Sequence, residues 1–132
     1  MLKVMAPLRV QVGKKWFVLN LNQYRNTHFH VLNKAKILYK EAIQSQVDAL
    51  SNVDKVIIHY MLFPKDKRLC DLDNVLAIHA KFFQDALTES GKIKDDNYMY
   101  VIGSTFELGK IDKLNPHVQI IIEPYRGIYG RK

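Results

Sequence analysis

Apolar residues recur along the chain with two different periods, which predict helices and strands respectively. Between about His30 and Leu50 they recur at spacings of three and four residues, which predicts an amphipathic helix. The same spacing predicts a second helix from about Leu72 or Asp73 to Glu89, with Gly91 suited to end it. The apolar positions are Val31, Ala35, Leu38, Ala42, Ile43 and Val47 in the first helix, and Val75, Leu76, Ile78, Phe82, Phe83, Ala86 and Leu87 in the second.

A dense apolar run at Lys55–Phe63 predicts a strand that is buried on at least one face, because Pro64 ends it and its length suits a strand. His59 lies inside this run. A lone histidine in a strand is more often a core or edge residue than a ligand, and we interpret His59 in that way.

Three further strands are predicted at Lys15–Leu21, Tyr98–Phe106 and His117–Glu123. The first is expected to run into a polar loop that contains Asn20, Asn22 and Asn26. The order strand, helix, strand, helix, strand, strand predicts a small α+β (or α/β) domain with a mixed sheet packed against two main helices.

Composition favours one globular domain over residues 1–132, because 132 residues with 48% hydrophobic and 25% charged content are ordinary for a single core. A basic tail from about residue 124 is expected to be flexible, and its tyrosines and arginines could contact nucleic acid. The single cysteine, Cys70, excludes an intramolecular disulfide. No apolar run is long enough for a membrane span and the N-terminus lacks the features of a signal peptide, so we expect a cytoplasmic protein without a membrane partner.

The net charge is +7 and the isoelectric point is about 9.5, which favours a polyanionic partner. A basic protein gains affinity for nucleic acid by releasing counterions from phosphates. The lysines of the first helix (Lys34, Lys36 and Lys40) could contact DNA, but we favour a solvated helix face.

Two aspartates at the start of the second helix are candidate metal ligands. Asp71 and Asp73 flank Leu72, and in an extended segment two such side chains project to the same side. Mg²⁺ takes oxygen ligands, usually one or a few carboxylates together with water and phosphate oxygens. The alternatives are an N-cap role for Asp71 or Asp73 and turn roles for the residues of Asp95–Asp96–Asn97.

Basic residues accompany these carboxylates. Lys65, Lys67 and Arg68 immediately precede the aspartates and could guide a DNA backbone toward them. Lys81 lies seven residues after Asn74, within about 20° of it on the helix, and either faces the metal site or extends past the edge of the core.

The order Asp71-Leu72-Asp73-Asn74, Lys81, Asp85-Ala86-Leu87, Gly91 and Asp95-Asp96 resembles the signature of RusA-type Holliday junction resolvases. The resemblance is best over about residues 56–100. It implies that Asp71, Asp73 and Asp96 hold Mg²⁺, for which Mn²⁺ can substitute. It also implies that Asn74 belongs to the DNA-binding set and that Lys81 is the basic catalytic residue.

What the resemblance implies for function is a Mg²⁺-dependent crossover junction endodeoxyribonuclease, which resolves Holliday junctions in DNA recombination and repair by paired phosphodiester cleavage. Such an enzyme is a homodimer that places one site at each of two opposed strands of a four-way junction, and it is often encoded by a phage or prophage. The alternatives are a nuclease for flaps or forks and a junction-binding protein that has lost catalysis.

Overall fold

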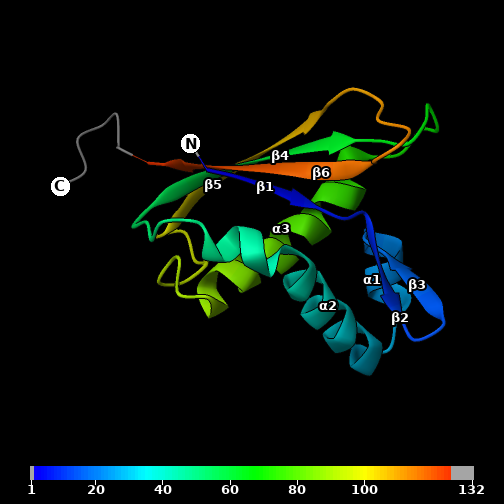
Figure 1. Ribbon diagram of the computed structural model, residues 1–132, viewed down its shortest axis with the longest axis horizontal. Coiled ribbons are helices and arrows are strands. Elements are labelled where there is room, and N and C mark those ends of the chain that lie inside the picture. Colours follow the sequence, from blue (N-terminus) through cyan, green and yellow to red (C-terminus); the bar gives the residue numbers. More distant parts are fainter. Residues whose placement is uncertain (1, 126–132) are drawn as a thin grey trace.

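A four-stranded mixed sheet forms one layer of the molecule in the computed structural model, which describes residues 2–125 (Figure 1). The strands lie in the order β1–β6–β4–β5, with β4 and β5 parallel and the two other pairs antiparallel. Their bounds are Leu2–Ala6 for β1, Val56–Phe63 for β4, Val101–Leu108 for β5 and His117–Pro124 for β6.

Two helices, α2 (Phe29–Asp48) and α3 (Leu72–Glu89), cover the same face of this sheet (Figure 1). Alternate residues of β4 are buried, because neighbouring side chains of a strand point to opposite faces. The buried side chains of β4 and β6 pack with the apolar stripes of both helices in one core. These observations confirm the α+β class, the mixed sheet, the two main helices and the burial of one face of β4.

The N-terminal part of the chain differs from the expectation. Here β2 (Arg9–Val12) and β3 (Lys15–Val18) form an antiparallel hairpin apart from the main sheet. The expected polar loop is the short helix α1 (Leu21–Asn26), because Asn20 Oδ1 accepts a hydrogen bond from the backbone N–H of Gln23 (2.8 Å) and caps that helix. The strand predicted to reach Leu21 therefore ends at Val18.

Helix α3 ends where the sequence predicts. Gly91 has a φ of +72°, a conformation that L-residues with side chains rarely adopt. The backbone N–H groups of Gly91 and Lys92 donate to the carbonyl oxygens of Thr88 and Leu87, the pair of hydrogen bonds that defines a Schellman ending.

A polar pair lies inside the core, between the two long helices. The Tyr39 hydroxyl of α2 and Nδ1 of His79 in α3 are 2.9 Å apart, and both side chains are fully buried. Within residues 2–125, Nε2 of His79 has no hydrogen-bond partner. Burial disfavours the charged imidazolium and lowers the pKa of His79 to about 3.

We predict that His79 makes the fold acid-sensitive. The folded-state pKa of about 3 lies below the ordinary value of 6.5, so the unfolded state takes up a proton first. Stability is then unaffected above about pH 6.5 and falls as the pH drops toward 3. His79→Leu removes this pH dependence of the free energy of unfolding. Urea unfolding at pH 7.5 and 4.5 should show that the native chain loses about 2–3 kcal/mol more than the variant. A difference between the two proteins that does not change with pH contradicts the prediction.

Candidate functional site

The two aspartates at the start of α3 are both exposed, and they occupy different positions in the helix. Asp71 occupies the N-cap position, but its side chain makes no capping hydrogen bond. Its backbone carbonyl accepts from the N–H of Asn74 (3.1 Å) instead. Asp73 follows in the first turn of the helix. The N-cap position of Asp71 agrees with one of the alternatives above, whereas its carboxylate remains available for a ligand.

Asn74 ties α1 to α3. Its Oδ1 accepts a hydrogen bond from the backbone N–H of Leu21 (3.1 Å), which is the first residue of α1 and 53 positions away in the chain. The first N–H groups of a helix have no partner within it, so this contact satisfies one of them. Asn74 therefore has a structural contact at the position where the sequence predicts DNA binding.

One open hollow of about 580 Å³ contains both aspartates. Arg25 of α1 also lines this hollow, and Cys70 lies beside Asp71. The side chains in this hollow supply two carboxylates for a hard cation and a guanidinium for phosphate. The complete lining is Leu21, Arg25, Cys70, Asp71, Leu72, Asp73 and Asn74.

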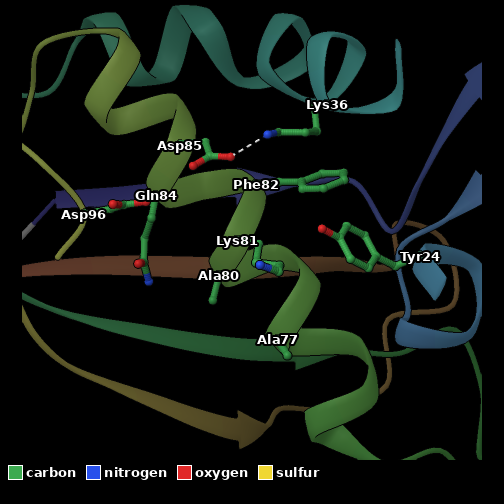
Figure 2. Close-up of a pocket in the computed structure, with 9 residues that line it drawn as sticks. All are labelled: Tyr24, Lys36, Ala77, Ala80, Lys81, Phe82, Gln84, Asp85 and Asp96. Atoms are coloured by element: carbon green, nitrogen blue, oxygen red, sulfur yellow. Dashed lines mark ion pairs between the residues drawn. The ribbon is translucent and has the colours of Figure 1, made fainter. Parts of the chain in front are cut away.

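Lys81 and Asp96 line a different hollow of about 310 Å³, farther along α3 (Figure 2). Lys36 Nζ forms an ion pair there with Asp85 Oδ2 (2.7 Å), drawn as a dashed line in Figure 2. Nζ of Lys81 lies 5.7 Å from the centre of the Tyr24 ring, a cation–π contact that places this lysine beside α1.

Asp96 is held in the turn that follows α3. Its backbone N–H donates to Oδ1 of Asp95 (2.7 Å), and the Asn97 side chain donates to Oδ2 of Asp95 (3.1 Å). Asp95 thus has the turn role that one alternative gave it, while the Asp96 carboxylate lines the hollow. Burial raises the pKa of Asp96, and a hydrogen bond with Asp95 and the charges of Asp85 and Asp95 raise it further.

The structure does not bring Asp96 to Asp71 and Asp73. Asp96 lies beside Asp85. Asp85 is twelve residues after Asp73 on α3, which corresponds to about 18 Å along the helix axis. Ligand oxygens lie about 2.1 Å from Mg²⁺, so one ion cannot contact both groups. Residues 2–125 contain no group of three His, Cys, Asp or Glu side chains placed to hold a metal. Asp71 and Asp73 therefore share one hollow, whereas Asp96, the third residue of the predicted set, lies in another.

The three basic residues predicted to guide DNA lie in the connection from β4 to α3. Lys65, Lys67 and Arg68 are all exposed, and the backbone N–H of Arg68 donates to Oδ1 of Asp66 (2.9 Å). The connection leads directly to Asp71, so it ends at the same end of α3 as the carboxylate pair.

Other candidates have structural partners. Lys40 pairs with Glu89 (3.0 Å), and together with the Lys36–Asp85 pair it links α2 to α3, so part of the lysine face packs against α3. His59 hydrogen-bonds Thr105 of β5 (2.7 Å) and Glu123 of β6 (2.8 Å), which agrees with its interpretation as a structural residue. Most of the basic tail, residues 126–132, lies outside the described residues.

Arg25 and Tyr24 were not predicted as site residues, because their segment was expected to be a loop. The capping signal of Asn20 before Leu21 could have revealed α1, and with it the wall that this helix adds to both hollows.

No protein-family model matches the chain, and a search of curated proteins finds no match. Within residues 2–125, every helix is too short or too polar to cross a membrane. The resemblance to RusA-type resolvases therefore stays a prediction from the motif.

We predict that the oxygen acceptor of Asn74 contributes to stability. Asn74→Ala removes the partner of the Leu21 N–H and should lower the free energy of unfolding by about 1 kcal/mol. Asn74→Asp keeps an oxygen acceptor at the same place and should lose less. Urea denaturation of both variants measures the difference, and equal losses would argue against this role.

Proposed function

We propose that this protein is a Mg²⁺-dependent endonuclease that cuts branched DNA, and that Asp71 and Asp73 hold the metal. The observation that carries the proposal is the exposed carboxylate pair at the start of α3, in a hollow that also contains Arg25. A nearby carboxylate repels a phosphate unless a cation lies between them, so acidic ligands beside basic residues suit a metal-assisted reaction on a polyanion.

The residues around the pair can position a phosphodiester. Arg25, which lines the same hollow, offers two parallel N–H donors to phosphate oxygens. Lys65, Lys67 and Arg68 approach from the β4–α3 connection and counter the repulsion between the carboxylates and DNA. When bound, Mg²⁺ would supply Lewis acidity toward a phosphate oxygen and lower the pKa of a water molecule.

Lys81 has a different role in this proposal from the one that the motif implies. It lies eight residues after Asp73 on α3, about 12 Å along the axis. A DNA strand carries one phosphate per about 3.4 Å of helix axis, so in this proposal Lys81 would contact a phosphate a few nucleotides from the cut. Asp96 lines the same hollow as Lys81, so in this proposal it would not be a ligand of the Mg²⁺ ion held by Asp71 and Asp73.

The branched substrate and the homodimer rest on the motif. Two copies of the site, related by a two-fold axis, would suit the two opposed strands of a four-way junction. A junction-binding protein without catalysis is the second candidate function, and the separation of Asp96 from the carboxylate pair is the observation that favours it.

We predict that cleavage depends on the pair. The purified protein, with Mg²⁺, should nick a labelled four-way junction symmetrically and leave the matching linear duplex intact, and EDTA should stop the reaction. Asp73→Asn should slow cleavage by more than about 100-fold without weakening junction binding, because it removes a metal ligand and lowers repulsion. Asp54→Asn, a change at an exposed carboxylate outside the hollow, is the matched control.

Three results would decide against parts of this proposal. Full activity of Asp73→Asn would remove this residue from the site. Tight junction binding without cleavage in the native protein would favour the second candidate function. Cleavage of flaps or forks in place of four-way junctions would keep the chemistry and change the substrate.

A further inference from the structure

The positive charge of the chain is concentrated in its first third. Residues 1–40 contain eight Lys or Arg residues and no Asp or Glu. The other 92 residues contain 12 basic and 13 acidic residues, so the first 40 account for the whole positive net charge. Two of these cations, Lys36 and Lys40, are paired with α3. The remainder lie mainly on the β2–β3 hairpin and the elements next to it.

The hairpin has one buried face and one exposed face. Val10 and Phe17 are cross-strand partners that point into the core, where Phe17 stacks on Phe82 of α3. Alternation along the strands places Arg9 and Trp16 on the opposite face. The Trp16 side chain is 47% exposed, and the Arg9 guanidinium lies 4.0 Å from the centre of its ring. The core therefore fixes the hairpin while an aromatic ring and a cation face outward.

The tip of the hairpin is short and basic. Gly13 has a φ of +64° and is the first residue of the two-residue turn, where the sharp reversal requires a positive φ. Lys14 and Lys15 follow it, and both are exposed. Neither forms an ion pair within residues 2–125. Lys15 pairs with Val12 and therefore shares the face of Val10 and Phe17. Lys14 occupies the turn itself, and Arg9 shares the face of Trp16.

More aromatic surface lies at the same end of the molecule. Helix α2 packs against β2, and its first turn lies below the hairpin in Figure 1. There His28 stacks on Phe29 and on His30, the Phe29 and His30 rings are tilted to each other, and the three centroids are 4.1–4.9 Å apart. Phe29 is 60% exposed. Exposed rings among unpaired cations are the combination that proteins use to hold unpaired nucleic-acid bases.

We propose that the exposed face of the β2–β3 hairpin binds single-stranded DNA, with Trp16 stacked on a base and Arg9 and Lys14 on backbone phosphates. The occupant is inferred from charge complementarity together with the exposed aromatic ring, because an uncharged partner would leave these cations without a role. The inference rests on the proposed function in one respect: the strand held here would be an unpaired segment at the branch point of the DNA to be cut.

Trp16 is the only tryptophan in the chain, so its fluorescence reports on this surface directly. The intact protein is titrated in EDTA with a 20-nucleotide single strand, and separately with the corresponding duplex. Binding of fluorescein-labelled copies is followed in parallel by anisotropy. Stacking should quench the tryptophan emission in step with the anisotropy change for the single strand, and quench it less for the duplex.

Two variants separate the aromatic and ionic contributions. Trp16→Ala should weaken single-strand affinity about tenfold, whereas Leu108→Ala, a change at an exposed apolar side chain of β5 outside the hairpin, should leave it unchanged. Arg9→Gln with Lys14→Gln should reduce the slope of log affinity against log salt by about 1.4, since each phosphate contact on a single strand contributes about 0.7. Circular dichroism and melting temperature confirm that each variant is folded.

The outcomes distinguish this inference from the proposed function because the titration needs neither metal nor cleavage. Saturable binding with unchanged Trp16 emission and unaltered affinity of Trp16→Ala would overturn the inference even if junctions are cut. Equal quenching by duplex and single strand would also overturn it. Quenching of Trp16 emission by the single strand, together with weaker single-strand affinity of Trp16→Ala, would support it even if no substrate is cleaved.

Discussion

The burial of one face of α3 against the sheet is the constraint on which the rest of the structure depends. Leu76, Ile78, Phe83 and Leu87 are almost completely buried, and together they bury enough apolar surface to fix the rotation of the helix about its axis. Once that rotation is fixed, the remaining faces of α3 present Asp73 and Lys81 to solvent. Every candidate residue on this helix is therefore placed by packing that does not involve it.

The second consequence of this packing is the place of α1. The Asn74 amide oxygen and the Lys81 ammonium group, nearly two turns apart on one face of α3, both contact α1. That helix forms a wall of the hollow with the carboxylate pair and of the hollow with Asp96. The two hollows are thus neighbours along a single helix, and a DNA strand that follows α3 would pass from one to the other.

The long elements were predictable because each carries a complete local signal. The dense apolar run before Pro64 predicted β4, and the three- and four-residue periods with the glycine after them predicted α2 and α3. The observed bounds of these elements agree with the predictions to within a few residues. The short strands β1 and β2 were not predictable, because they have only five and four residues and derive their stability from partners distant in the chain. The carboxylate pair was predictable as neighbours in sequence. The position of Asp96 depends on how the turn after α3 folds back, which no local pattern encodes.

The claim that α3 holds a divalent cation through Asp71 and Asp73 is tested most directly by a ¹⁵N–¹H NMR titration of the intact protein with Mg²⁺. If these two aspartates hold the ion, the amide signals of Asp71, Asp73 and Asn74 shift with one saturable binding curve, and Asp73→Asn abolishes these shifts. The signals of Asp95 and Asp96 then stay in place. Saturable shifts at Asp95 and Asp96 without any at the start of α3 would contradict it.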